Sequence, residues 1–410
     1  MNFKILTLII MAVVLLYQLL KLVLSIRSFS NPIPECVKDV YDEETFAGWR
    51  KYSAEKARLG IVSTVTYCLI TALLIVLDAF SWFAGLFKGV YLQYFAVTLL
   101  SVISSQIPGT VFAYIDDMVI EQKYGFNRST RKTFIADRIK EFLIELLISA
   151  ALTALLASLH RRLGDGMLVL FGAALFVITL AITLLFPFLS KVFNKFTPLE
   201  DGELKEKLTS MLTSHGYTVR AIQVMDASKR SSKSNAYFTG LGKTKTIVLY
   251  DTLLTSSTPD EICAVFAHEM GHGLHHDTLK MQLLNIVNIA CLAVCAFAAV
   301  KFPEVYKDFG FDKVNYGFAL ILIGETLMSV VSPLIGMITN FTSRRAEYRA
   351  DAQAVKEGFG DALVGALKTL ARANFSHLSP SRVLVALEYS HPPLAERIRA
   401  IEALKAEKTE

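Results

Sequence analysis

The sequence contains the stretch Thr258-Pro-Asp-Glu-Ile-Cys-Ala-Val-Phe-Ala-His268-Glu-Met-Gly-His272, which predicts a helix with a strong N-terminal cap. Thr258 is a good N-cap residue, and Glu261, three residues later, completes a capping box. Pro259 suits the first helical position, where its missing N–H group has no helical partner to lose. We therefore expect a helix to begin directly after Thr258.

Two histidines and a glutamate in this helix predict a metal site. His268 and His272 are four residues apart, so their side chains leave the same side of the helix and can bind one ion. Zinc accepts imidazole and carboxylate ligands, and a catalytic zinc site leaves one position for water. Glu269 is placed to take a proton from that water. The alternative is a chance match on a structural helix, expected in roughly one chain in a hundred of this length.

The composition indicates a membrane protein. The chain has 410 residues, of which 53% are hydrophobic, and its mean hydropathy is +0.44. Soluble domains contain about 45–50% apolar residues on a comparable count. The excess is concentrated in long apolar runs. The five cysteines match neither a thiolate zinc site nor a disulfide framework.

Seven apolar runs are long enough to cross a bilayer as helices. The first run is too long for the apolar region of a signal peptide, and no small-residue cleavage site follows it, so we expect it to remain. The fourth run is the weakest because it contains Glu145. The predicted spans lie at about 5–24, 60–83, 91–113, 142–159, 167–189, 283–300 and 317–338.

Lysine and arginine residues alternate between rich and poor loops along these spans. Six lie between the first and second spans and six between the third and fourth, whereas the second loop has only Lys88 and the fourth only Arg161 and Arg162. The positive-inside rule then puts the N-terminus outside, and residues 190–280 and the C-terminal segment on the cytoplasmic side. The net charge of +5 is therefore mainly a topological signal, and we expect no nucleic-acid partner.

Residues 190–280 are mixed in character and long enough for a small domain. We expect a helix at 204–215, a strand at 221–225 and a β-hairpin between residues 235 and 250, followed by the capped helix. The chain then divides into an N-terminal membrane domain of five spans (1–189), a catalytic domain (190–280), two further spans (281–340) and a C-terminal helical part that completes the metal site (341–410).

The metal site needs a third protein ligand on the same side of the membrane. Glu347 and Asp351 follow the seventh span and are four residues apart on one predicted helical face. Glu347 could bind the metal, while Asp351 accepts a hydrogen bond from a ligand histidine and fixes its tautomer. The alternative is a solvated face, on which these carboxylates pair with Arg344, Arg345 and Arg349.

Three motifs resemble, in their order, those of the M48 zinc metallopeptidases. They are His268-Glu-Met-Gly-His272, Ser343-Arg-Arg-Ala-Glu347-Tyr-Arg-Ala-Asp351 and Ser390-His-Pro-Pro393. The length, the seven spans and Asn194-Lys-Phe-Thr-Pro-Leu199 are similar to the CAAX prenyl protease 1 (Ste24-type) branch of that family. The similarity covers nearly the whole chain.

This resemblance implies a fold. We expect a mainly α polytopic membrane protein with about seven transmembrane helices and a zincin-like (gluzincin) α+β catalytic domain that contains a small β-hairpin or sheet. It also implies an intramembrane chamber onto which the metal site faces. Glu145 and Glu325, which lie within apolar spans, would line this chamber; the alternative is that they pair with lysine or arginine on neighbouring helices.

The resemblance also implies roles for individual residues. It implies one zinc ion per chain, bound by His268, His272 and Glu347. Glu269 would be the general base and Asp351 the carboxylate behind a ligand histidine. His391 would donate a hydrogen bond to the oxyanion. Asn235 and Ala236 match an edge strand that holds a peptide by main-chain pairing, although a plain hairpin strand is the alternative. Arg397 is expected to assist in substrate binding.

These features together predict an integral-membrane zinc endopeptidase, and the resemblance implies that it acts on prenylated C-terminal CAAX peptides. One alternative is an HtpX-like quality-control metalloprotease, which has fewer spans and cleaves misfolded or hydrophobic peptides. A site-2-type protease is a second alternative. That class has its zinc motif inside an apolar span, whereas here the motif lies in a capped helix before the sixth span. The third is a non-enzymatic seven-span transporter or receptor. We expect a monomer whose partners are the peptide and the bilayer. The compact loops favour the bacterial inner membrane, and the endoplasmic reticulum membrane is the alternative.

Overall fold

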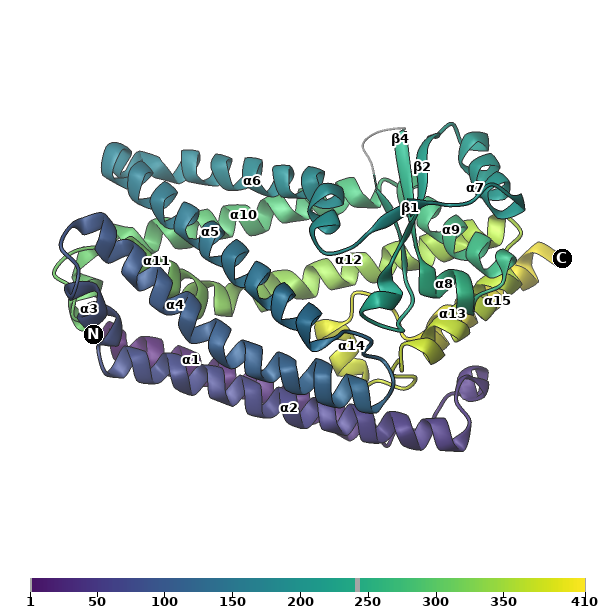
Figure 1. Ribbon diagram of the computed structural model, residues 1–410, viewed down its shortest axis with the longest axis horizontal. Coiled ribbons are helices and arrows are strands. Elements are labelled where there is room, and N and C mark those ends of the chain that lie inside the picture. Colours follow the sequence, from purple (N-terminus) through teal and green to yellow (C-terminus); the bar gives the residue numbers. More distant parts are fainter. Residues whose placement is uncertain (1, 240–243, 410) are drawn as a thin grey trace.

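The computed structural model describes residues 2–239 and 244–409. The molecule is elongated, with long helices along most of its length and a small sheet with shorter helices at one end (Figure 1). The N-terminus lies at the end away from the sheet, and the C-terminus lies at the end that carries the sheet (Figure 1).

Long apolar helices occupy the positions of the seven predicted spans. They are α1 (Phe3–Ser28), α2 (Glu43–Val76), α4 (Val90–Ala113), α5 (Arg131–Leu163), α6 (Met167–Leu189), α10 (Asp277–Lys301) and a continuous helix made of α11 (Tyr316–Ile321), the π-helical η7 (Leu322–Met328) and α12 (Ser329–Lys356). Within the described residues six stretches are long and apolar enough to cross a membrane, and one of them, Arg131–Thr183, runs through both α5 and α6. The prediction of a mainly helical multi-pass membrane protein is therefore confirmed.

Several predicted span ends are wrong because helices continue beyond their apolar parts. Helix α2 already begins at Glu43, where the Asp42 side chain caps it by accepting a hydrogen bond from the Thr45 N–H at 2.7 Å. Thr130 caps α5 in the same way. The second predicted span also ran too far, since α2 ends at Val76. Hydropathy detects only the part of a helix that suits the bilayer, so the charged turns beyond it were assigned to loops.

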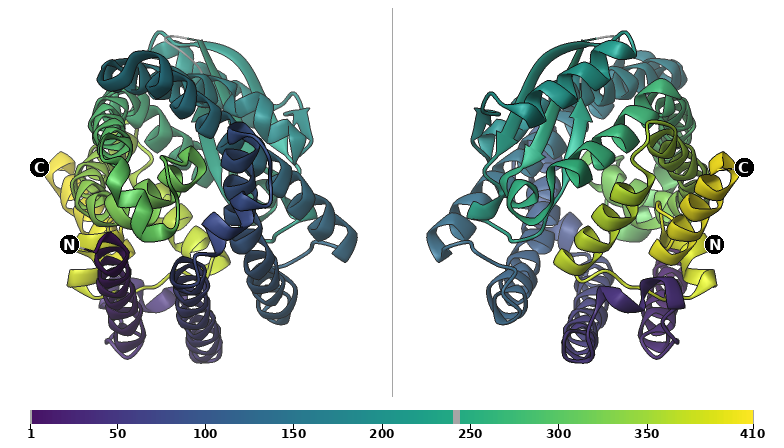
Figure 2. Two further views of the ribbon diagram at one scale, coloured as in Figure 1. Left: turned by 90° about the vertical axis from the view of Figure 1, so that its left-hand side faces the viewer. Right: turned by 90° about the vertical axis from the view of Figure 1, so that its right-hand side faces the viewer.

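The spans are arranged around a common long axis (Figure 2). A cavity is lined by residues of several of them. Its volume is about 530 Å³, and many serine and threonine side chains line it together with Glu145 of α5 and Glu325 of η7. Gln106 of α4 donates a hydrogen bond to Glu145. Among the described residues neither glutamate forms an ion pair with lysine or arginine, so the expectation that they face a cavity fits and the alternative of ion pairing does not.

The sheet has four strands, β1 (Phe196–Pro198), β2 (Thr218–Met225), β3 (Ala236–Thr239) and β4 (Thr244–Tyr250), in the order β1-β2-β4-β3. The predicted hairpin is present, because β3 and β4 are antiparallel with Ala236 opposite Leu249. Strand β2 pairs with β4 in parallel, which leaves β3 at one edge of the sheet. Helices α7 (Glu203–Ser214), α8 (Asp251–Ser256) and α9 (Pro259–Leu274) share a buried core with the sheet.

Three C-terminal helices complete this end of the molecule: α13 (Gly360–Ala373), α14 (Arg382–Glu388) and α15 (Leu394–Thr409). Helices α13 and α15 pack with the segment after α1, which contains the 3₁₀ helix η1 (Glu35–Val40), so the first and last parts of the chain share one core. The four-part domain division stays a prediction. The remaining short helices are α3 (Ala79–Gly85), η2 (Tyr114–Glu121), η3 (Gly164–Gly166), η4 (Ser190–Val192), η5 (Ala227–Lys229) and η6 (Pro303–Phe309).

A half-buried histidine joins the end of α1 to the C-terminal part. The ring of His377 lies against Trp49, with 4.9 Å between the ring centroids. His377 Nδ1 accepts a hydrogen bond from the Ser379 N–H at 3.3 Å, so Nε2 carries the proton and donates to the Ser28 hydroxyl at 2.7 Å. A second proton on Nδ1 would face the Ser379 N–H. The structure therefore requires neutral His377.

We expect acid to weaken this junction through His377. Burial lowers the pKa of His377 to about 4, below the value of about 6.5 for an exposed histidine. Between these two values the unfolded chain binds the proton more readily than the folded protein does. The contribution of His377 to the free energy of unfolding is therefore fully present above about pH 6.5 and is lost as the pH falls toward 4. Thermal unfolding of the detergent-solubilised protein measures this, and His377→Gln should show a weaker pH dependence in this window. Identical pH dependence in the two proteins would contradict the assignment.

Candidate active site

Helix α9 begins as the sequence predicts. The Thr258 hydroxyl accepts a hydrogen bond from the Glu261 N–H at 3.3 Å, and the Glu261 carboxylate accepts one from the Thr258 N–H at 2.8 Å, which completes the capping box. Ile262 and Phe266 are buried in the core that α9 shares with the sheet. This core fixes the rotation of α9 about its axis and hence the side from which its histidines project.

Close packing of α9 on α12 brings Glu347 to the histidines. A Cβ atom at Gly271 would lie 2.9 Å from Ala350 Cα and 3.2 Å from the Ala350 carbonyl oxygen. Only a residue without a side chain allows the two backbones to lie this close. Ala350 follows Glu347 by three residues, so the contact at Gly271 sets the position of Glu347 relative to His268 and His272.

We predict that Gly271→Ala separates α9 from α12 and weakens metal binding. The added methyl group meets backbone atoms, which cannot rotate away, and overpacking of this kind costs about 1–3 kcal/mol. The thermal midpoint and the metal content of the purified variant should both fall. Gly48→Ala is the matched control, because nothing lies within 4 Å of a Cβ atom at this helical glycine. Equal metal content in the two variants would contradict the prediction.

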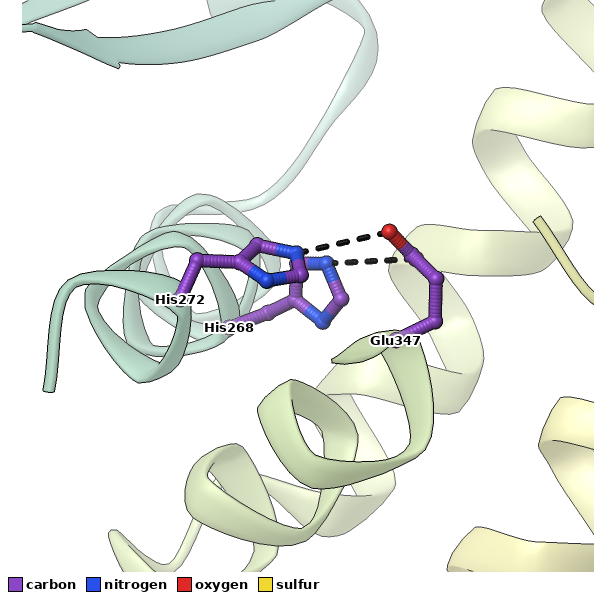
Figure 3. A group of neighbouring side chains, drawn as sticks. All are labelled: His268, His272 and Glu347. Carbon is purple, nitrogen blue, oxygen red and sulfur yellow. Dashed lines mark ion pairs between the residues drawn. The ribbon is translucent and has the colours of Figure 1, made fainter. Parts of the chain in front are cut away.

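Three side chains converge on one point, His268 and His272 from α9 and Glu347 from α12 (Figure 3). One ligand atom from each lies within 4.8 Å of the others. His268 Nε2 is 3.5 Å from Glu347 Oε2, and His272 Nε2 is 3.4 Å from Glu347 Oε1. The two rings are nearly perpendicular, at 85°, so their Nε2 atoms approach the same point from different directions.

Two buried aspartates hold the far side of the histidine rings. His268 Nδ1 lies 2.9 Å from Asp351 Oδ1, and His272 Nδ1 lies 3.2 Å from Asp277 Oδ2. A carboxylate only accepts, so each neutral ring carries its proton on Nδ1 and presents the lone pair of Nε2 toward Glu347. Asp351 occupies the place that we expected for it.

Asp277 is a residue that the sequence analysis missed. It is the first residue of α10 and is 4% exposed, and Arg349 donates a hydrogen bond to it at 2.6 Å. The available signal was its position five residues after His272, immediately after the metal-binding helix. His276, between the two helices, adopts a left-handed conformation with φ 54°, which turns the chain so that Asp277 faces back toward His272.

The donor atoms fit a zinc ion. Two imidazole nitrogens and one carboxylate form a set typical of catalytic zinc sites, which bind water at the remaining position. Glu347 Oε2 is buried and accepts no hydrogen bond from any described residue, and its close neighbours are the positively charged Arg397 and the His268 ring, so it keeps a lone pair for a cation. Burial alone would lower the pKa of His272, but its hydrogen bonds to Glu347 and Asp277 raise it to about 9. A positive charge at this point is therefore favoured, and a metal ion would replace that proton.

Arg397 lies behind the site, where it pairs with both carboxylates of α12. Its Nε and Nη2 atoms donate to the two oxygens of Asp351 at 2.9 and 2.6 Å, and its Nη1 atom is 3.2 Å from Glu347 Oε2. Only 8% of Arg397 is exposed. This geometry favours a role in holding Asp351 and Glu347, and the expected contact with substrate stays a prediction.

His391 approaches the same point from another direction, and Glu269 lies next to the first ligand candidate in the sequence. His391 Nε2 is 3.3 Å from Glu347 Oε1, while its side chain is 63% exposed, so it stands at the open side of the site. Glu269 is half-buried and directly follows His268 on α9. Its negative charge contributes to the raised pKa of His272, which places it near the ligand group.

Within the described residues β3 is an edge strand that pairs only with β4, and it is in contact with α9. The Tyr250 N–H of β4 donates to the Asn235 carbonyl at 3.1 Å. Successive residues of an antiparallel strand point their polar backbone groups to opposite sides, so those of Ala236 point away from β4. The Ala236 N–H donates instead to the Asn235 side chain at 2.9 Å. The backbone of Ala236 therefore faces the outer edge of β3, whereas the Asn235 carbonyl faces β4, and peptide binding by these two residues stays a prediction.

Two family models together match most of the chain. Residues 198–405 match the model of peptidase family M48, and residues 23–195 match a model described as the CAAX prenyl protease N-terminal region with five membrane helices. The chain belongs to peptidase family M48. All residues discussed above as candidate ligands or catalytic groups lie within the first of these matches.

Individual relatives of this M48 peptidase resemble it over most of its length. CAAX prenyl protease 1 homolog of Arabidopsis thaliana is 33% identical over 90% of each chain. CAAX prenyl protease 1 of Saccharomyces cerevisiae is 33% identical, over 92% of this chain and 90% of the yeast protein. The crystal structure of S. mikatae Ste24p matches with a TM-score of 0.91 and 30% identity, over 98% of this chain and 99% of that one.

Membership of this family settles the class of the protein. It is a multi-pass membrane metallopeptidase, as the motifs predicted. The alternative of a non-enzymatic transporter or receptor with an incidental motif is therefore wrong. The family also implies a metal cofactor for the group of His268, His272 and Glu347.

Proposed function

We propose that this M48 peptidase is a zinc endopeptidase that hydrolyses a peptide bond in prenylated C-terminal CAAX-type peptides. One observation carries the proposal: His268, His272 and Glu347 converge on one point, with Glu269 on the same helix and the outer edge of β3 beside it. The printed names of the relatives, which are CAAX prenyl proteases, support the substrate class.

The proposed chemistry is hydrolysis by an activated water molecule. Zinc, held by His268, His272 and Glu347, would supply polarisation of the scissile carbonyl and a lowered pKa for water. Glu269 acts as general base, taking the proton from the attacking water and passing it to the leaving amine. His391, at the open side of the site, donates a hydrogen bond to the oxyanion that develops on the carbonyl.

The other residues of the site position these groups. Asp351 and Asp277 keep the two histidine rings in the tautomer that presents Nε2 to the metal. Arg397 neutralises the buried carboxylates of Asp351 and Glu347. The peptide adds as a further strand to the outer edge of β3, where the C=O group of Ala236 points away from β4 and its N–H group would exchange the Asn235 side chain for the peptide.

The position of the site supports a substrate that carries a lipid and reaches the site from the membrane. Glu347 lies in α12, and Asp277 begins α10, so the site is built at the ends of two membrane helices. The basic segment after α1 packs at the same end of the molecule, against α13 and α15. By the positive-inside rule this end faces the cytoplasm. One chain supplies every group named, so a monomer suffices; the host membrane stays a prediction.

Cleavage of matched peptides by the purified protein tests this function. Two CAAX peptides that differ only in the prenyl group on cysteine are compared, with Glu269→Gln as the blank. We expect the prenylated peptide to be cleaved at a higher kcat/KM and the blank to be inactive. Equal cleavage of both peptides would overturn the prenyl-specific assignment and favour the HtpX-like quality-control alternative.

A further inference from the structure

A buried carboxylate links the membrane helices to the segment that leads into β3. Glu121, the last residue of η2, is 8% exposed. One of its oxygens, Oε1, accepts hydrogen bonds from the Tyr52 hydroxyl at 2.6 Å, Lys56 Nζ at 3.0 Å and Lys233 Nζ at 3.1 Å. Tyr52 and Lys56 belong to α2, whereas Lys233 comes three residues before β3 begins. The Lys233 ammonium also lies 5.1 Å from the centre of the Phe126 ring.

The backbone around Lys233 is held by two further parts of the molecule. The Lys233 carbonyl accepts a hydrogen bond from the Thr252 hydroxyl of α8 at 3.0 Å. The Ser234 N–H donates to the Asn374 side-chain oxygen at 3.2 Å, and the Ser234 carbonyl accepts from the Asn374 amide nitrogen at 3.3 Å. Lys233 and Ser234, which precede β3, are thus hydrogen-bonded to the membrane part, to α8 and to the end of α13.

The neighbouring segment is tied to the membrane part as well. The Arg128 N–H donates to the Arg230 carbonyl at 2.9 Å, and the Ser232 N–H donates to the Phe126 carbonyl at 3.0 Å. Asn127 and Ser231 form an isolated antiparallel bridge between these hydrogen bonds. Residues 230–233, which lead into β3, therefore run alongside the loop that follows η2. Among the described residues of this segment, only Lys233 places a charged side chain against Glu121.

We propose that Lys233 is a positioning residue that fixes the outer edge of β3 relative to the metal site, a proposal that rests on the peptidase function above. In the part of the chain that the structure describes, β3 pairs only with β4, so contacts outside the sheet help to fix where its outer edge lies. The peptide must pair with Ala236 while its carbonyl reaches the metal site on α9. Lys233 sets that distance by attaching the start of β3 to Glu121, which α2 holds in place.

The other hydrogen bonds of Glu121 make it possible to test the positioning role of Lys233 without unfolding the protein. When Lys233 is replaced, Glu121 keeps Tyr52 and Lys56, so its charge stays paired inside the protein. None of the zinc-ligand candidates contacts Lys233 in any hydrogen bond or ion pair of the described residues. A variant at Lys233 should therefore fold and bind zinc, and its defect should appear where the peptide binds.

The test compares Lys233→Met with Lys233→Arg in the purified full-length protein, with the prenylated peptide as substrate. We expect Lys233→Met to raise KM by about tenfold, the size of one charge-assisted hydrogen bond, and to change kcat by less than about threefold. Zinc content should be unchanged, and Lys233→Arg should restore KM. Lys368→Met is the matched control, because Lys368 forms an ion pair with Asp39, at 2.7 Å, and no hydrogen bond or ion pair of the described residues joins it to β3.

Hydrogen exchange supplies a second readout that does not need catalysis. Amides of residues 234–239 should exchange faster in Lys233→Met than in the wild-type protein and the control, while those of α9 should not. Unchanged KM together with unchanged exchange in β3 would overturn the proposal. If the wild-type protein cleaves neither peptide, the peptidase assignment fails, and the exchange experiment still decides whether Lys233 positions β3. If Lys233→Met does not fold, Lys233→Gln and Glu121→Gln replace it in both experiments.

Discussion

Glu269→Gln should leave the purified protein with its full zinc content and remove its peptidase activity. Glutamine has nearly the shape of glutamate but cannot accept the proton of the attacking water, and a general base contributes about 10²–10⁴ to the rate. Glu269 is not one of the three converging ligands, so metal binding should be unaffected. Single-turnover cleavage and elemental analysis of the same sample measure the two quantities.

A charge-neutral substitution elsewhere serves as the control for this experiment. Glu200→Gln makes the same chemical change at an exposed position outside the site and should keep wild-type activity. Wild-type activity in Glu269→Gln would exclude Glu269 as the base. Loss of zinc from that variant would instead assign Glu269 to the ligand set.

Glu347→Gln should lower zinc affinity more than any change behind the ligands does. The carboxamide has a similar volume, but it loses the negative charge that faces His268, His272 and Arg397. Removing a partner behind a metal ligand costs about 10- to 100-fold in metal affinity. We therefore expect about that loss in Asp351→Asn, and a loss of more than about 100-fold in Glu347→Gln.

Competition with a chelator measures zinc affinity across this series. Arg397 keeps its two hydrogen bonds to Asp351 in Glu347→Gln, so the variant should stay folded and its far-ultraviolet circular dichroism should not change. Equal zinc affinity in Glu347→Gln and wild type would remove Glu347 from the ligand set. A larger loss in Asp351→Asn than in Glu347→Gln would reverse the roles of the two carboxylates.

Local sequence signals predicted the metal-binding helix correctly because the forces that define it are local. The cap at Thr258 and the spacing of His268 and His272 depend on residues within one helix. The position of Glu347 depends instead on the packing of α9 against α12, with Gly271 against Ala350. Helical spacing alone allowed either a ligand or a solvated face there, and the resemblance to M48 peptidases was needed to choose.

Other features could not be derived because they arise from contacts between distant segments. Strand β2 pairs in parallel with β4 and not with β3, the next strand in the sequence. No periodicity in the sequence predicts this pairing. Asp277 lies in an ordinary polar stretch until the left-handed turn at His276 directs it at His272. The charged first turns of α2 and α5 lie outside the apolar runs and were therefore assigned to loops.

Zinc titration of the metal-free protein tests the central claim most directly. The purified protein is stripped with a chelator, and cleavage of the prenylated CAAX peptide is followed as zinc is added. We predict no cleavage before addition, a linear rise with zinc and a plateau at about one ion per chain, as expected for a site with three protein ligands. Cleavage by the stripped protein, or activity that does not depend on added zinc, would contradict the assignment.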